Sequence, residues 1–181
     1  MKSGLIFLVA VGAGACFPHR AERLPAAIPA VAGTAHDQFA LRSIEIVVGK
    51  GALVEPRKCL YAHYTGWLTN GKKFDSSRDS TPSGMPKPPI SFPQGARRVI
   101  AGWDLGFEGM RVGGKRRLFI PFQLAYGEAG RPPLIPPKSE LIFDVELMAV
   151  ADTLPRAEAP QRGQATIPQC APWAVVGARG R

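Results

Sequence analysis

The pattern of apolar and polar positions marks one regular block between two less regular ends. Within residues 40–151, short runs alternate apolar and polar residues, as half-buried strands do. The runs that predict strands are LRSIEIVV, KCLYAHYTGWL, KRRLFIP and SELIFDVELMAV.

Three of these runs indicate which side of each strand is buried. Their apolar residues recur at every second position, which places them on one face of a strand. Between the second strand and its return through Phe74, Thr69-Asn70-Gly71 predicts a hairpin turn, because Asn-Gly readily takes the positive φ angles of a type I′ turn. The predicted inward faces are Ile44, Ile46 and Val48; Leu60, Ala62 and Tyr64; and Leu141, Phe143, Val145 and Leu147.

One segment has helical periodicity instead. Apolar residues from Val99 to Met110 recur at steps of three and four, and Gly113-Gly114 ends the segment. Several strands and one short amphipathic helix predict an α+β domain, in which an antiparallel β-sheet folds over the helix. The crevice between sheet and helix is the expected place for a site.

The first residues have the features of an export signal. Lys2 precedes the apolar run GLIFLVAVGAGAC, which is too short to span a bilayer but suits the apolar part of a signal peptide. Ala13 and Ala15 form an A-x-A cleavage site, so residues 1–15 are predicted to be a signal peptide. Cys16 would also suit lipidation, which predicts a periplasmic protein, either free or lipid-anchored. An untargeted apolar N-terminus and a cytoplasmic location are the less favoured alternatives.

The two segments that flank the regular block are predicted to have little ordered structure. Residues 16–39 are rich in Ala and Pro without sustained periodicity, which is typical of a linker, and residues 152–181 have the same character. Cys59 and Cys170 have no metal-ligand spacing. A disulfide between them is one alternative, but we expect unpaired cysteines.

The net charge of +9 does not by itself predict nucleic-acid binding. Basic residues are dense only at Arg97-Arg98 and at Lys115-Arg116-Arg117, and such short runs are usually solvated faces. No nucleic-acid-binding motif accompanies them. The three histidines lack metal-ligand spacing, and no phosphate loop or nucleophile motif is present. We therefore expect no nucleic acid, no metal and no cofactor.

Four segments, taken in order, resemble the FKBP-type peptidyl-prolyl cis-trans isomerases, which bind rapamycin-like macrolides. They are HYTGWLTNGKKFDSSRD, RVIAGWDLGFEGMRVGGKRRLFIP, LAYGEAGRPPLIPP and LIFDVELMAV. The order and spacing of four blocks make the resemblance specific, and it implies an FKBP-like domain over residues 40–151. Together with the export signal, it predicts an exported single-domain protein of bacterial type that acts as a monomer.

The resemblance implies catalysis of rotation about X-Pro bonds. Amide resonance gives this rotation a barrier of about 18–20 kcal/mol, and a site that favours the twisted amide speeds it without covalent chemistry. A dry apolar pocket suits the twisted state better than water does. The expected partners are proline-containing segments of unfolded or newly exported proteins, with rapamycin-like macrolides as inhibitors.

The resemblance also assigns the binding residues. Trp103 would form the floor of a proline pocket. For the other apolar residues, plain core packing is the alternative to a binding role. The walls would be Tyr64, Phe74, Ile90, Val99, Ile100, Ile135 and Phe143.

Two polar residues would touch the reacting amide. Asp75 would lie at the pocket edge, hydrogen-bonded to the Tyr64 hydroxyl, since a carboxylate beside an apolar wall is costly to bury unpaired. Its alternative is a structural role, held by Ser76 to Arg78. Tyr126 would offer its hydroxyl to the substrate carbonyl, and its alternative is packing within the turn.

The chain departs from the family pattern at three places. Ile90 stands where a phenylalanine is usual, Arg131 stands where a histidine is common, and the proline-rich loop over residues 80–89 is longer. The first and last of these departures keep a second function open, a non-catalytic chaperone or peptide-binding module built on the same groove.

Overall fold

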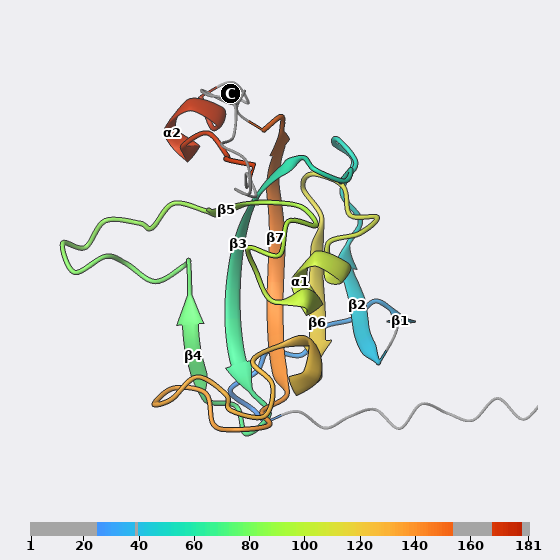
Figure 1. Ribbon diagram of the computed structural model, residues 1–181, viewed down its shortest axis with the longest axis vertical. Coiled ribbons are helices and arrows are strands. Elements are labelled where there is room, and N and C mark those ends of the chain that lie inside the picture. Colours follow the sequence, from blue (N-terminus) through green and yellow to red (C-terminus); the bar gives the residue numbers. More distant parts are fainter. Residues whose placement is uncertain (1–24, 39, 154–167, 179–181) are drawn as a thin grey trace, which may run out of the picture.

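An antiparallel sheet of seven strands organises the part of the chain that the structure, a computed structural model, describes: residues 25–38, 40–153 and 168–178. The strand order is β1-β2-β6-β7-β3-β4, and β5 pairs with β3 (Figure 1). The strands are β1 (Thr34–Gln38), β2 (Leu41–Val47), β3 (Cys59–Leu68), β4 (Lys73–Ser76), β5 (Ile90–Pro93), β6 (Lys115–Ile120) and β7 (Leu141–Ala151).

The two longest strands form the centre of the sheet. β3 pairs with β7 from Cys59↔Ala151 to Leu68↔Leu141. The alternation predicted for both strands is confirmed, because their inward-facing apolar residues belong to the main buried cluster, with Tyr64 packed half-buried against it. The predicted α+β class, an antiparallel sheet over a short helix, is likewise confirmed.

The inward face predicted for the first strand is wrong. Leu41 and Ser43 are the buried positions of β2, whereas Val48 lies beyond the strand and its side chain is 71% exposed. Ile44 instead packs on the opposite face of the sheet. Both faces are covered at this strand, so apolar residues occur on both sides and alternation alone does not identify the core side.

The hairpin between β3 and β4 forms where predicted, but with a different turn. Gly71 has φ of 86°, whereas Asn70 is not among the residues with positive φ. The Gly71 N–H donates to the Leu68 carbonyl at 2.9 Å, and the Leu68 N–H donates to the Lys72 carbonyl at 2.9 Å. The three predicted residues, 69–71, therefore form the loop, but it ends in a left-handed glycine and is not a type I′ turn.

The helix is shorter than the periodicity predicts. α1 (Ala101–Gly106) covers fewer than two turns. Phe107 begins the turn that follows and Met110 comes directly after that turn, and both remain buried. α1 lies directly on the sheet: a Cβ on Gly102 would fall 2.3 Å from an Ile120 methyl, and one on Gly106 would fall 2.6 Å from a Leu118 methyl. These two glycines therefore allow the close contact between helix and β6.

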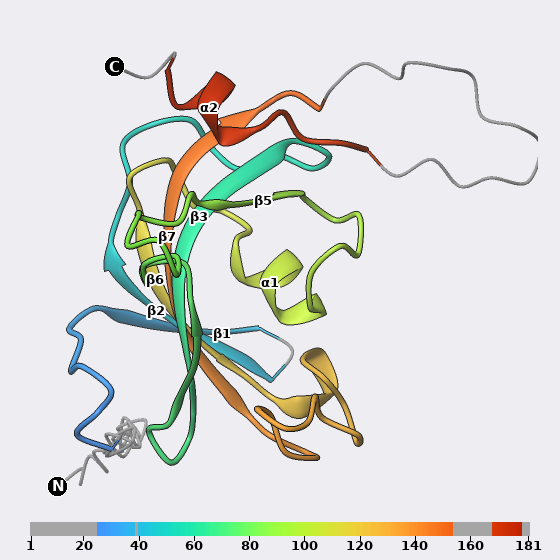
Figure 2. The same ribbon diagram turned by 90° about the vertical axis from the view of Figure 1, so that its left-hand side faces the viewer.

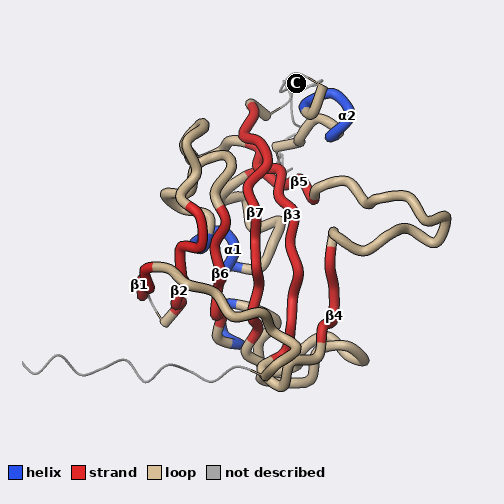
Figure 3. Tube along the Cα trace, turned by 180° about the vertical axis from the view of Figure 1, so that it is seen from behind, coloured by secondary structure: helices blue, strands red, loops and turns tan. Residues whose placement is uncertain are grey.

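α1 covers one face of the curved sheet, here called the front face, and the N-terminal segment crosses the other, the back face (Figures 2 and 3). On the back face, Ile28 packs against Trp67, Phe119 and Ile142. The chain then enters β1, which pairs with β2 in the register Thr34↔Glu45 to Gln38↔Leu41.

This arrangement corrects the linker prediction in part. Residues 25–33 lie against the back face and residues 34–38 form a strand, although no periodicity marks them. Residues 16–24 lie outside the described part of the chain. The segment is ordered because the sheet offers it an apolar surface and a strand edge, and neither is visible in its own composition.

The C-terminal segment also differs from the prediction. Cys59 and Cys170 form a disulfide, the Tyr61 hydroxyl donates to the Ala171 carbonyl at 2.7 Å, and the Tyr61 and Trp173 rings pack 5.8 Å apart. The short helix α2 (Trp173–Val176) follows. The expectation of unpaired cysteines is therefore wrong, and residues 168–178 are not a featureless tail.

Two of the three residues of the basic run in β6 are not solvated, whereas the side chain of Lys115 is 47% exposed. The side chain of Arg117 is 1% exposed and pairs with Asp144, and the side chain of Arg116 is 12% exposed and pairs with Glu45. The predicted signal peptide and Cys16 lie outside the described residues. Among the helices that are described, none is long and apolar enough to cross a membrane.

Candidate active site

Three aromatic rings from three different elements meet on the front face. Tyr64 of β3, Trp103 of α1 and Phe143 of β7 lie with ring centroids 5.0 to 6.1 Å apart. Phe74 of β4 packs edge-on against Phe143 at 5.5 Å. Tilted and edge-to-face contacts of this kind stabilise aromatic clusters. Four of the predicted binding residues therefore form one unit, here called the aromatic site.

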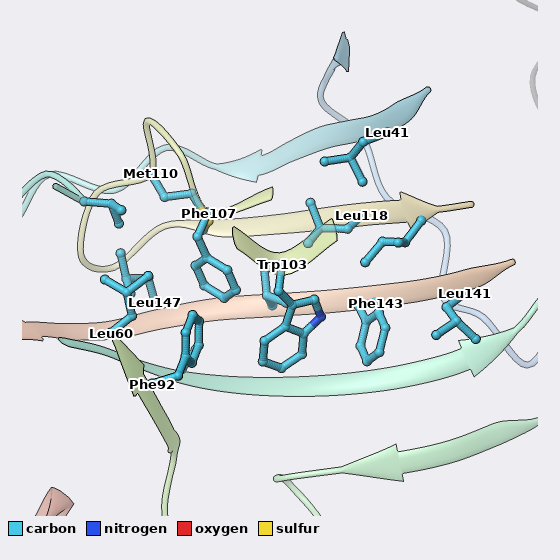
Figure 4. Close-up of a cluster of buried hydrophobic side chains, with 14 of the residues drawn as sticks. Leu41, Leu60, Phe92, Trp103, Phe107, Met110, Leu118, Leu141, Phe143 and Leu147 are labelled. Carbon is cyan, nitrogen blue, oxygen red and sulfur yellow. The ribbon is translucent and has the colours of Figure 1, made fainter. Parts of the chain in front are cut away.

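Trp103 lies at the centre of the buried cluster (Figure 4). Its side chain is 4% exposed, with Phe92 and Phe107 packed behind it at centroid distances of 5.6 and 5.7 Å. Phe92 is not among the predicted binding residues, although its ring supports the predicted pocket floor. The position of the indole is thus fixed from behind by two further aromatic rings.

The remaining predicted wall residues also pack against this cluster. Ile135 is buried, and its backbone pairs with Arg131 through hydrogen bonds of 2.8 and 3.1 Å. The others, Ile90, Val99 and Ile100, are partly buried, so each keeps some surface that a ligand can contact. Tyr126, predicted to bind the substrate carbonyl, also packs partly buried against this cluster.

The contact predicted between Tyr64 and Asp75 is present. The Tyr64 hydroxyl donates to Asp75 Oδ2 at 2.6 Å, and the Ser76 N–H donates to Asp75 Oδ1 at 2.8 Å. The structural contact with Ser76 and the predicted contact with Tyr64 therefore coexist. Asp75 is itself exposed at the edge of the aromatic site, where a ligand can reach it.

The protonation state of Tyr64 follows from this environment. Burial, the hydrogen bond to Asp75 and the negative charge of that carboxylate all raise the pKa of Tyr64 well above its ordinary value. The hydroxyl therefore stays protonated at neutral pH and keeps donating to Asp75. The hydrogen bond from Tyr64 therefore holds the Asp75 side chain in place.

Gly66 is a site residue that the sequence analysis missed. It lies on the same face of β3 as Tyr64, and a Cβ at this position would fall 2.7 Å from ring atoms of both Phe74 and Phe143. Since real Cβ atoms do not approach this closely, only glycine lets the two rings meet over the strand. Gly66 ends the short motif YTG in β3, but the need for glycine there is visible only once the rings that pack above it are known.

Replacing Gly66 with alanine should lower the free energy of unfolding by about 1–3 kcal/mol, because the added methyl displaces one of the two rings. Chemical denaturation measures this loss. The double variant Gly66→Ala/Phe74→Leu should recover part of it, since leucine frees the space that the methyl needs. A Gly66→Ala protein as stable as the unmodified one would contradict the proposed crowding.

Two surface features flank the aromatic site. The Arg131 guanidinium lies over the ring of Tyr126, 5.8 Å from its centroid. The proline-rich loop over residues 80–89 projects from the sheet between β4 and β5 (Figure 1), with Met85 exposed. Within the described residues, no three His, Cys, Asp or Glu side chains gather to hold a metal ion.

Proteins called FK506-binding proteins are similar to this chain over more than half of its length. A protein called FK506-binding protein from Neisseria meningitidis is 50% identical over 93 residues, which are 51% of this chain and 80% of that protein. FK506-binding protein 4 of Dictyostelium discoideum is 50% identical over 107 residues. These residues are 59% of this chain but only 27% of that relative's length.

Solved structures agree with the sequence matches. The crystal structure of a peptidyl-prolyl cis-trans isomerase from Pseudomonas syringae aligns with a TM-score of 0.54 and 32% identity, covering 63% of this chain and 77% of that one. Residues 50–148 match the family described as FKBP-type peptidyl-prolyl cis-trans isomerase. This match covers more than half of the chain, in agreement with the four sequence blocks and the aromatic site. The chain belongs to the FKBP-type peptidyl-prolyl cis-trans isomerase family.

Proposed function

We propose that the aromatic site catalyses cis-trans isomerisation of X-Pro bonds in proline-containing segments of unfolded or newly exported proteins. The observation that carries the proposal is the Tyr64–Asp75 hydrogen bond at the edge of an aromatic cluster built on Trp103. It places one fixed carboxylate beside apolar rings that suit a proline ring.

Catalysis would follow from the difference between planar and twisted amides. The proline ring packs against the aromatic site, so the amide leaves water for apolar surroundings. A planar amide is strongly polarised by resonance, whereas a twisted amide is less polarised. The twisted amide therefore loses less solvation free energy when it moves from water to apolar surroundings. No proton transfer or covalent step is required.

The polar residues would orient the twisting amide. Asp75, fixed by Tyr64, lies at the edge where the amide nitrogen loses its conjugation. Tyr126, which packs partly buried against the cluster, would donate its hydroxyl to the carbonyl of the residue before the proline. Each contact would contribute a modest share of the rate, because the apolar transfer accounts for the rest.

Asp75→Ala and Tyr126→Phe should each reduce kcat/KM for a Leu-Pro tetrapeptide about tenfold, which corresponds to about 1.4 kcal/mol of transition-state stabilisation. A protease-free isomerisation assay measures the rates, and circular dichroism checks that each variant is folded. Folded variants with unchanged rates would remove both residues from the mechanism. A folded parent protein that accelerates no peptide would leave a peptide-binding module as the function.

Rapamycin-like macrolides should compete for the same site. The proposal rests on family membership and on the apolar surface at Trp103. Inhibition by rapamycin, together with loss of macrolide binding in a folded variant of the aromatic site, would place ligand and substrate on the same residues.

We further propose that the protein acts outside the cytoplasm, as an exported monomer in the periplasm, either free or lipid-anchored at Cys16. The signal-like sequence of residues 1–15 motivates this location. The Cys59–Cys170 disulfide supports it, because disulfides persist in oxidising compartments. Cell fractionation tests the location, and metabolic labelling with a fatty acid tests the anchor.

A further inference from the structure

The geometry points to Arg131 as a specificity-determining residue that favours X-Pro substrates with an acidic side chain immediately before the proline. The inference rests on the proposed isomerase function and names a substrate class for it. Arg131 is exposed, and its guanidinium lies over Tyr126 at the side of the aromatic site.

The position of Arg131 is fixed by its backbone. Arg131 and Ile135 exchange two backbone hydrogen bonds, of 2.8 and 3.1 Å, and so form a small isolated bridge within the loop. Ile135 is buried in the core. The backbone that carries the guanidinium is therefore anchored to the same cluster that forms the aromatic site.

The charge of Arg131 is uncompensated within the described part of the chain. In the same loop, Lys138 and Glu128 pair with each other, because Lys138 Nζ lies 2.8 Å from Glu128 Oε2. The carboxylate of Asp75 already accepts hydrogen bonds from Tyr64 and Ser76. A positive charge thus remains beside the site without a carboxylate partner of its own.

This charge acts on the site itself. It opposes the rise in the pKa of Tyr64, which is caused mainly by burial and the hydrogen bond to Asp75. Since the Tyr126 hydroxyl would bind the carbonyl of the residue before the proline, the side chain of that residue comes closest to the guanidinium above Tyr126. A carboxylate there gains a partner, whereas an ammonium is repelled.

Two further arginines add positive charge next to residues of the aromatic cluster. Arg97 and Arg98 are exposed and directly precede Val99 and Ile100, which pack against the cluster. Neither forms an ion pair with a described residue. The chain on both flanks of the aromatic site is therefore basic, which favours acidic over basic peptides.

Isomerisation rates of a matched peptide series test the inference. In succinyl-Ala-Xaa-Pro-Phe para-nitroanilide, Glu and Gln at Xaa differ in charge and hardly in shape. At low salt, kcat/KM should be about three- to fivefold higher for Glu than for Gln, as expected for a partly exposed charge pair. The ratio should fall towards one as salt rises, because ions screen such pairs.

Variants locate the effect. Arg131→Gln should bring the Glu-to-Gln ratio close to one, Arg131→Lys should keep part of it, and Arg131→Glu should invert it. Arg111→Gln is the matched control, since Arg111 is also exposed but lies before β6, at the opposite end of that strand from the Arg131 loop. It should leave the ratio as it is.

The outcomes separate this inference from the proposed function. If the parent protein accelerates the peptides with a Glu-to-Gln ratio of one, or if Arg131→Gln leaves a higher ratio unchanged, the role of Arg131 is overturned while the isomerase remains. If no peptide of the series is accelerated by the folded protein, the proposed function fails and the inference fails with it.

Discussion

Replacing both Cys59 and Cys170 with alanine should lower the free energy of unfolding by about 3–5 kcal/mol. The disulfide joins residues 111 positions apart, and a link over so long a loop removes much of the freedom of the unfolded chain. A loss of this size is a large part of the 5–15 kcal/mol that stabilises a typical domain.

The double cysteine variant should also loosen the C-terminal segment. The hydrogen bond from Tyr61 to Ala171 and the contact between Tyr61 and Trp173 would remain, but without the covalent link they must hold the segment alone. Amide hydrogen exchange over residues 168–178 should therefore accelerate. Isomerase activity should be unchanged, because Cys59 and Tyr61 lie on the opposite side of β3 from Leu60, Ala62 and Tyr64.

Reductant provides the control for this experiment. Dithiothreitol should destabilise the parent protein by about the same amount and leave the double variant unaffected. Chemical denaturation with and without reductant measures both effects. The dependence of the free energy of unfolding on denaturant concentration should also become steeper without the disulfide, because the unfolded chain is then less restricted. Equal stability of the parent and the variant under oxidising conditions would show that the disulfide does not stabilise the fold.

Replacing Arg117 with methionine should lower the free energy of unfolding by about 2–4 kcal/mol. The guanidinium donates to both carboxylate oxygens of Asp144, at 2.6 and 2.7 Å, and to the Pro29 carbonyl at 2.6 Å. Removing it leaves a carboxylate without its partner. Because the Asp144 side chain is 28% exposed, water offsets part of this cost, and we place the effect below that of a fully buried pair.

A second substitution distinguishes the broken pair from simple loss of packing. Arg117→Met/Asp144→Leu removes both charges, so it should recover most of the stability that Arg117→Met loses. The surface pair of Lys138 and Glu128 is the matched control, because both side chains are more than half exposed. Lys138→Met should cost less than about 1 kcal/mol. If the double variant is no more stable than the single one, packing rather than charge explains the loss.

Much of the site could be predicted because its signals are local or belong to the family. Alternation in β3 and β7 gave the correct inward faces, since a period of two reports directly on a strand with one clear core side. The resemblance placed Trp103, Tyr64 and Phe143 together and predicted the Tyr64–Asp75 contact. The catalytic roles of Asp75 and Tyr126 remain predictions until their variants are measured.

Other features depend on neighbours that are distant in the sequence. Gly66 matters because rings from β4 and β7 meet above it, and the helix ends at Gly106 although apolar periodicity continues to Met110. Periodicity reports burial but not backbone conformation, so buried residues in turns extend the apparent helix.

The family, the fold class and the inward faces of the two central strands follow from the amino-acid sequence alone, because they depend on local alternation and on the order and spacing of four blocks of residues. What covers the back of the sheet depends instead on contacts between segments that are distant in the sequence. Burial of Arg117 and pairing of Cys59 with Cys170 both require chain ends to fold onto β3 and β6. The residues of those ends show no periodicity of their own, since their order comes from the surface that they meet.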